Sequence, residues 1–215
     1  MKKDNRNTED NRKLTKAEER RKKEYEEIKE KMLREGYKEK DLTIGIVYAN
    51  VMAFIMAMPF IVLFCILFSI GKHSFKMEMN FIECMIFFIL FFICIVVHEC
   101  IHGVTWAIFA KNHFKSIEFG FMVEYFTPYC TCKSPLNKYQ YIIGAIMPTV
   151  ILGILPCIIS LFSKQTFLLY FGLLMILAGG GDMSIIYKIL LNRSEKKEEL
   201  YLDHPYKCGT MIFEK

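Results

Sequence analysis

Two histidines separated by one helical turn give this sequence its clearest capacity for metal chemistry. The run His98-Glu99-Cys100-Ile101-His102 has the form HExxH. On a helix, residues i and i+4 lie on one face, so the imidazoles of His98 and His102 can share a metal ion. Glu99 lies about 100° further round the helix, within reach of a water on that metal. Zinc lowers the pKa of such a water to about 7, so Glu99 is predicted to act as the general base.

The motif lies deep inside an apolar stretch, which strengthens this interpretation. Residues 85–110 have the length and composition of a transmembrane helix. Ionisable side chains are costly at that depth, and those that occur there usually serve a function. Metal binding requires neutral imidazoles and would explain why they are buried. The alternative is a polar cluster that is satisfied by hydrogen bonds alone.

A catalytic zinc ion needs a third protein ligand and an open position. Asp182 is the only acidic residue inside another apolar stretch. At 1.5 Å per residue, His102 lies about 12 Å below the membrane face, His98 about 18 Å and Asp182 about 13–14 Å. We therefore predict that His98, His102 and Asp182 hold the metal. Two alternatives remain: Asp182 pairs with Lys188 or a backbone donor, or the third ligand is one of Glu83, His113, Glu118, Glu124, Asp203 and His204.

Three glycines, Gly179-Gly180-Gly181, immediately precede Asp182. Glycines allow helices to approach closely in membranes, and three together also weaken a helix. Either effect would bring Asp182 towards the HExxH helix. Packing of small residues without a functional role is the alternative.

Long uncharged runs predict a membrane protein with several spans. Apolar residues make up 53% of the 215 positions and charged residues 24%, yet residues 1–41 alone hold 15 Lys+Arg and 12 Asp+Glu. Four runs are long enough to cross a membrane, namely 44–70, 85–110, 141–162 and 166–191. Pro59 should kink the first run, and Pro148 and Pro156 should interrupt the third. A soluble bundle of very apolar helices is the alternative.

The chain is predicted to have three parts. Residues 1–41 form a basic cytoplasmic segment in which 14–35 are good helix formers, with Gly36 ending the helix. Residues 42–191 form a four-span membrane domain, and residues 192–215 form a cytoplasmic tail. The first 40 residues lack the apolar core of a signal peptide, so the N-terminus should stay on the cytoplasmic side.

Positive charge predicts the orientation of the spans. With four spans, both termini and residues 111–140 share one side, and the opposite side carries only Lys72, Lys76 and Lys164. Because cytoplasmic loops are rich in Lys and Arg, both termini are placed in the cytoplasm of a multi-pass cell-membrane protein.

Residues 114–140 differ from the rest of the membrane domain. Ile117, Phe119 and Phe121 alternate with polar or small residues, which indicates a strand. We predict one or two short hairpins on the cytoplasmic face, so the fold class is an all-α polytopic membrane protein with about four transmembrane helices and a short β-hairpin segment between spans two and three.

The eight cysteines show no framework spacing and are predicted to be free thiols. Cys130 and Cys132 share one strand face, or else have a redox or metal role.

These features together resemble the site-2 protease group of intramembrane zinc metalloproteases. The chain more closely resembles a bacterial membrane family described as zincin peptidases, whose members combine HExxH with a segment like Tyr129–Leu136 and an Asp-His-Pro tail, here Asp203-His204-Pro205. The resemblance covers roughly residues 85–215. It implies hydrolysis of peptide bonds within or beside a membrane, with the strand-rich segment holding an extended substrate. In site-2 proteases glycine follows the liganding aspartate within an Asn-Pro motif, whereas here the glycines precede Asp182.

The predicted function is therefore a zinc-dependent membrane endopeptidase that acts on a membrane protein or peptide. The lipid bilayer is the other expected partner, and no feature indicates nucleic-acid binding. A metal-binding scaffold or regulator without turnover is the alternative, and Glu99→Gln separates the two. A transporter is disfavoured because the first and third spans offer almost no polar path.

Overall fold

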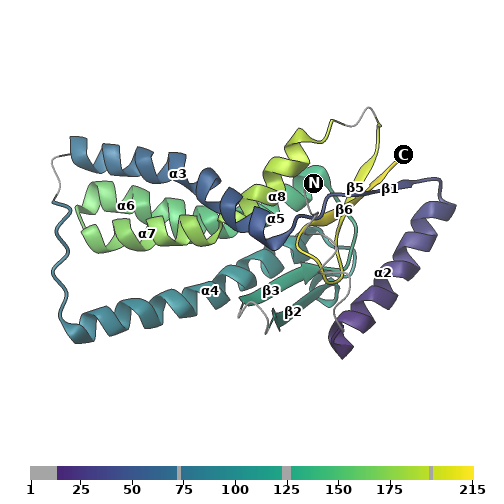
Figure 1. Cartoon of the computed structure of the whole chain (residues 1–215), viewed down its shortest axis with the longest axis horizontal. Helices are drawn as coiled ribbons and strands as arrows, with labels where there is room; N and C mark the ends of the chain where they lie inside the picture. The colour runs from purple at the N-terminus through teal and green to yellow at the C-terminus, as the bar shows by residue number, and fades with distance from the viewer. Residues whose placement is uncertain (1–13, 72–73, 123–126, 194–195) are drawn as a thin grey trace, which may run out of the picture.

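The computed structural model describes residues 14–71, 74–122, 127–193 and 196–215. Long helices form one end of the molecule, and two small sheets with one further helix form the other end (Figure 1). His98, His102 and Asp182 lie on helices, whereas most of the charged residues in the described part of the chain lie on the sheets and on the further helix. The molecule is thus divided into an apolar helical end and a polar, sheet-containing end.

Within the described residues, three helical segments are long and apolar enough to cross a membrane. They are α3 (Ile46–Ile70), α4 (Phe81–Phe109) and the segment Lys138–Ser163. A fourth results if α7 (Thr166–Ala178) and α8 (Gly180–Leu191), bent by 49°, form one span. Large apolar side chains cover the outer faces, and Phe81 and Phe162 expose 78% and 82% of their surface. Such a surface suits lipid better than water, so the membrane prediction is supported with three or four spans.

The third span is interrupted, as its prolines predict. It consists of α5 (Lys138–Pro148), a π-helical turn (Thr149–Ile154) and α6 (Leu155–Ser163). A proline has no N–H to donate, so the regular hydrogen-bond pattern is lost at Pro148 and Pro156. The wider π turn between them is a local distortion that is often found at functional sites.

The glycines before Asp182 break the helix and allow a close approach, but the close approach is to α3 and not to the HExxH helix α4. The helix breaks at Gly179, between α7 and α8. A methyl group on Gly180 would lie 2.6 Å from the carbonyl oxygen of Ala53, so the backbones of α8 and α3 touch there. The break and the close approach together fix the first turn of α8, which carries Asp182.

The predicted strand-rich segment contains one hairpin. Strands β2 (Ile117–Met122) and β3 (Thr127–Cys132) pair antiparallel, and Ile117 lies opposite Cys132. A short 3-10 helix (His113–Ser116) leads into β2 from α4. The prediction of a hairpin between the second and third spans is therefore confirmed.

A second sheet was not predicted, so the all-α description is incomplete. Its antiparallel order is β1 (Lys38–Asp41), β6 (Thr210–Glu214), β5 (Glu199–Asp203) and β4 (Leu136–Asn137). The tail strands β5 and β6 lie between β1 and β4, which come from far earlier in the chain. This sheet thereby joins the predicted N-terminal segment, membrane domain and tail, whose division into domains remains a prediction.

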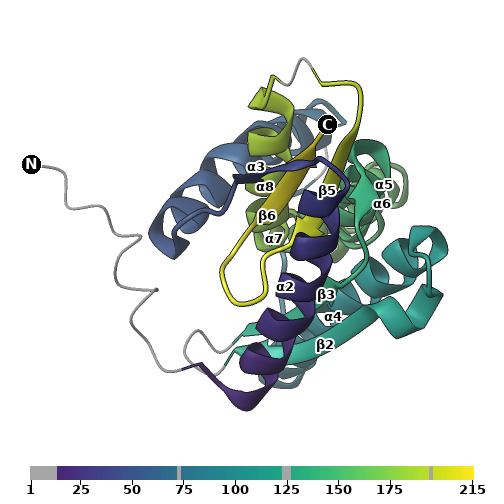
Figure 2. The same cartoon turned by 90° about the vertical axis from the view of Figure 1, so that its right-hand side faces the viewer.

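The predicted N-terminal helix is α2 (Lys16–Arg34). Thr15 and Glu18 form a capping box at its start, and Gly36 follows its end with a φ of 90°. The buried side chains of Tyr25 and Met32 belong to an apolar cluster with Leu202, Met211 and Phe213 of the four-stranded sheet. Figure 2 shows α2 crossing in front of both sheets.

We predict that Gly180→Ala destabilises the protein, whereas Gly181→Ala does not. An alanine methyl at 180 would meet the Ala53 backbone, while at 181 it would have no neighbour within 4 Å. The expected loss for Gly180→Ala is about 1–3 kcal/mol of unfolding free energy, read from thermal unfolding in detergent. Because alanine favours helix at both positions, equal stabilisation of the two variants would contradict the close contact.

Candidate metal centre

Helix α4 presents the HExxH side chains towards the interior of the helical end. His98 and His102 are buried, and Glu99 is half-buried. One ligand atom from each of the three side chains lies within 4.8 Å of the others. The predicted helical spacing therefore produces a compact group that can bind a metal.

Asp182 reaches the same group from the first turn of α8. Its Oδ2 atom lies 3.0 Å from Nε2 of His98 and 3.4 Å from Nε2 of His102. Zinc bonds of about 2.0–2.1 Å in tetrahedral geometry place neighbouring ligand atoms about 3.4 Å apart. The three side chains thus fit a zinc ion by spacing and by donor type.

The ring of His102 is fixed by its neighbours on α4 and α5. Its Nδ1 atom lies 2.8 Å from the carbonyl oxygen of Gly144, which can only accept, so Nδ1 carries the proton and Nε2 faces Asp182. The indole of Trp106 stacks on the imidazole at a centroid distance of 5.0 Å. This indole donates in turn to the carbonyl oxygen of Tyr141. Such outer contacts orient a metal-binding histidine.

Glu99 points away from the face of α4 that His98 and His102 share, and towards the hairpin. The backbone amide of Cys130 in β3 faces its carboxylate. Glu99 also lines the same cavity as His98, His102 and Asp182. Glu99 thus lies next to the two imidazoles and on the cavity wall, which is the position that a general base requires.

The cavity in front of the metal group has a volume of about 440 Å³. Its walls come from α4, α5, α7, α8 and β3, and from the loop between β5 and β6. Glu18 and Arg21 of α2 line it as well. The predicted N-terminal helix and tail therefore both take part in enclosing the site.

Asp203 and His204 of the tail also line this cavity, but their polar contacts are with protein groups. Asp203 accepts hydrogen bonds from the Tyr141 hydroxyl at 2.6 Å and from the Cys132 amide at 2.8 Å. Burial raises the pKa of the Asp203 carboxyl above its ordinary value. His204 Nδ1 accepts from the amides of Tyr206 and Lys207. The two hydrogen bonds of Asp203 therefore link the tail to β3 and α5, while those of His204 stay within the tail.

The remaining candidates for the third ligand that the structure describes make other contacts. Glu83 belongs to the capping box of α4, and His113 donates to the carbonyl oxygen of Ala107. Lys188, the alternative partner of Asp182, donates to the carbonyl oxygen of Thr43. Glu124 lies outside the described residues.

Cys130 and Cys132 lie on β3, as the pattern predicted, and are free thiols. Burial raises the pKa of both, that of Cys132 to about 12, so neither forms a thiolate near neutral pH. Within the described part of the chain, the group that could hold a metal contains no cysteine. A redox or metal role for this pair is therefore not supported.

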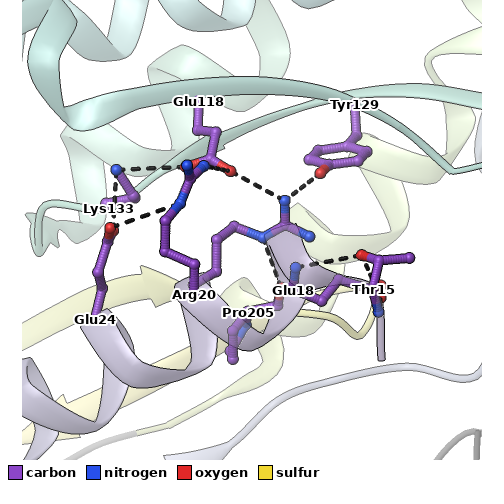
Figure 3. A network of polar contacts seen from close by, with 9 residues as sticks. Thr15, Glu18, Arg20, Glu24, Glu118, Tyr129, Lys133 and Pro205 are labelled. Carbon is purple, nitrogen blue, oxygen red and sulfur yellow. Dashed lines mark hydrogen bonds and ion pairs between the residues drawn. The ribbon is translucent and has the colours of Figure 1, made fainter. Parts of the chain in front are cut away.

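A network of charged side chains joins α2 to the hairpin and the tail (Figure 3), and Arg21 of this network lines the cavity. Glu118 of β2 pairs with Arg20 at 2.9 Å, Arg21 at 3.3 Å and Lys133 at 3.4 Å. Burial alone would raise the pKa of the Glu118 carboxyl, but these three cations outweigh it and hold the pKa below its ordinary value.

Two further contacts extend this network to the tail and along α2. Lys133 also pairs with Glu24, while Arg21 donates to the carbonyl oxygen of Pro205 and contacts the Tyr129 hydroxyl. No pattern in the sequence predicts this network, because its members are spread over α2, the hairpin and the tail.

Comparison with known proteins agrees with this chemistry. Residues 91–196 match the model of a family described as "putative zincin peptidase". The matched segment contains the HExxH motif, the hairpin and Asp182. Neither the curated proteins nor the solved structures gave a match. The family match and the His98-Glu99-His102 group together support a zinc metallopeptidase.

We predict about one zinc ion per chain in the wild type, and its loss in His102→Ala, because two ligands do not retain zinc well. Glu99→Gln should keep the metal, since Glu99 is not among the expected ligands. Metal analysis of the purified proteins measures both. Equal zinc content in wild type and His102→Ala would contradict this site.

Asp203→Asn provides a separate prediction about the tail. One amide group cannot accept both hydrogen bonds as the carboxylate does, so the free energy of unfolding should fall by about 1–3 kcal/mol. Zinc content should stay at the wild-type level, because both hydrogen bonds of Asp203 are with protein groups away from the two imidazoles. Loss of zinc from a folded Asp203→Asn protein would instead make this residue a ligand.

Proposed function

We propose that this chain is a zinc-dependent endopeptidase that hydrolyses peptide bonds within or near a membrane. The observation that carries the proposal is the position of the Asp182 carboxylate, 3.0 and 3.4 Å from two imidazoles on a helix apolar enough to span a membrane. An acid on an apolar helix is expensive unless it is paired or binds a metal. His98, His102 and Asp182 would hold the ion, which leaves a fourth position for substrate.

Zinc at this site would act as a Lewis acid on the scissile carbonyl and would favour ionisation of water. Glu99 would accept the proton of the attacking water and pass it to the leaving amine. Its place beside the two imidazoles and on the wall of the same cavity supports this role. Catalysis by general acid–base transfer requires that the carboxylate reach the reacting proton without displacing a metal ligand.

The hairpin supports an extended substrate as the reactant. Strand β3 pairs with β2 along one edge, and its residues 127–131 line the cavity in front of the metal group. A peptide that adds to a strand edge is held in the extended form by backbone hydrogen bonds. A helical membrane segment would therefore need to unwind before cleavage, because its carbonyls are otherwise bonded within the helix.

The side of the membrane on which the protein acts is proposed from the distribution of Lys and Arg and from the segments that line the cavity. Both termini are assigned to the cytoplasm by the distribution of Lys and Arg. The cavity is lined by α2 and by the loop before β6, so its mouth belongs to this same side. The substrate is proposed to be a membrane protein or peptide, and the site-2-protease likeness is part of the proposal.

The second candidate is a metal-binding scaffold or regulator without turnover. The observation in its favour is that α2 and the tail both line the cavity, and thereby restrict access to the metal group. A scaffold would need the three ligands but not Glu99.

Glu99→Gln in proteoliposomes tests these two functions against each other. The substrate probe is a library of quenched fluorescent peptides, each carrying one apolar membrane-spanning segment. We expect wild-type protein to cleave members of this library, and Glu99→Gln to lower the rate by about 10²–10⁴-fold while zinc content is unchanged. Equal cleavage rates in the two proteins would contradict the role of Glu99. Zinc binding without cleavage by wild-type protein, together with full cellular function of Glu99→Gln, would favour the scaffold.

A further inference from the structure

Two buried polar atoms in the described residues have no hydrogen-bond partner: Nδ1 of His98 and Oγ1 of Thr149. Both side chains lie next to Gly179. A methyl group placed on that glycine would lie 2.1 Å from Thr149 Oγ1 and 3.5 Å from His98 Cε1, the ring carbon between Nδ1 and Nε2. Buried polar groups are nearly always paired, so two unpaired groups beside the same glycine call for an explanation.

The two histidines of the motif differ in whether Nδ1 has a hydrogen-bond partner. His102 donates its Nδ1 proton to the carbonyl oxygen of Gly144. His98 lies one turn earlier on α4, and Thr149 lies just after Pro148 on the same third span as Gly144. The side chain of Thr149 is 2% exposed and begins the π-helical turn. One span therefore places an acceptor near each imidazole.

We propose that Thr149 positions His98 by accepting the hydrogen bond of its Nδ1–H, directly or through one water. This inference rests on the proposed zinc site. A hydroxyl has two acceptor sites and one donor, so it can accept from His98 while donating to a backbone carbonyl of the preceding turn. A proton held on Nδ1 leaves the lone pair of Nε2 for the metal beside Asp182.

The matched pair Thr149→Ala and Thr149→Ser tests this role. Both variants lose the same methyl group, and they differ only in the hydroxyl. The measurement is the zinc dissociation constant of the full-length protein in detergent, from competition with a chelator. We expect Thr149→Ala to bind zinc about 10–100-fold more weakly than wild type, and Thr149→Ser to stay within about threefold of wild type. Thermal unfolding of the metal-free proteins shows whether both variants fold.

The outcomes separate the inference from the function it rests on. Equal zinc affinity of Thr149→Ala and wild type would overturn the role of Thr149 and leave the metal site in place. A similar loss in Thr149→Ser and Thr149→Ala would also overturn it, because the hydroxyl would then make no difference. Wild-type protein that binds no zinc would overturn the metal site and this inference together.

A different observation, the way α2 is held, carries a second inference independently. The C-terminal half of α2 is fixed by apolar contacts of Tyr25 and Met32 with the four-stranded sheet. The N-terminal half reaches the hairpin and tail through the polar network of Figure 3, in which Arg20, Arg21 and Lys133 converge on Glu118. Glu18 and Arg21, in this same half, line the cavity.

We infer that residues 15–24 form a lid over the cavity, closed by the ionic latch at Glu118. The Arg20 and Lys133 side chains of the latch are 60% and 27% exposed, so their ion pairs with Glu118 are weakened by water and screened by salt, whereas the apolar contacts of the other half are not. Loss of the latch would therefore release the N-terminal half of α2 while its C-terminal half stays docked. The lid would control the entry of peptide to the metal group.

Thiol labelling tests the latch without any need for catalysis. Cys130 lines the cavity, while Cys84 lies outside it in the first turn of α4, near the end of that helix, so Cys84 serves as the internal reference. We expect Glu118→Gln and Arg20→Gln, which act from the two sides of the latch, each to speed labelling of Cys130 by a maleimide severalfold relative to Cys84. Arg34→Gln, which removes an exposed ion pair with Glu30 at the far end of α2, should have no effect.

Site-resolved mass spectrometry gives the two labelling rates. Higher ionic strength should likewise speed labelling of Cys130 in wild type and should have less effect in Glu118→Gln. Unchanged Cys130 labelling in both latch variants would overturn the lid. Acceleration in Glu118→Gln alone would also overturn it, because it would indicate a loosened hairpin rather than a released helix.

Discussion

The main constraint on this structure is the energetic cost of burying ionisable side chains among apolar helices. Two imidazoles and two carboxylates come together where most neighbouring side chains are aliphatic or aromatic. Each group alone would be strongly unfavourable at membrane depth. Grouped so that the Asp182 carboxylate meets both imidazoles, they satisfy one another and form a site that suits a divalent cation. Other features of the fold can be understood as the means of bringing this group together.

Irregular backbone is used where the helices must meet. The break at Gly179 turns the first turn of α8 towards α4, and Gly180 allows α8 to touch α3. The π-helical turn after Pro148 places Thr149 near His98, while Gly144 one turn earlier accepts from His102. The departures from ideal helix geometry are thus concentrated at the metal group.

Local patterns in the sequence predicted the parts of the site that follow from helix periodicity and apolar depth. The HExxH motif predicted that His98 and His102 share one face of α4, and similar depths predicted that Asp182 would lie near them. The observed contacts agree with the predicted position of Asp182. The role of Asp182 as a metal ligand remains a prediction. The four-stranded sheet could not be predicted in this way, because β1 and β6 are short and lie at opposite ends of the chain. Glu118 likewise meets Arg20 through tertiary packing, for which spacing along the chain gives no signal.

The most direct test of this account is the position of zinc in crystals of the wild-type protein, from anomalous scattering at the zinc edge. The account predicts one strong peak about 2.0–2.2 Å from Nε2 of His98, Nε2 of His102 and a carboxylate oxygen of Asp182, with a fourth position open to the cavity. A peak bound to the histidines but with the Asp182 carboxylate turned away, or zinc held elsewhere in the chain, would contradict it.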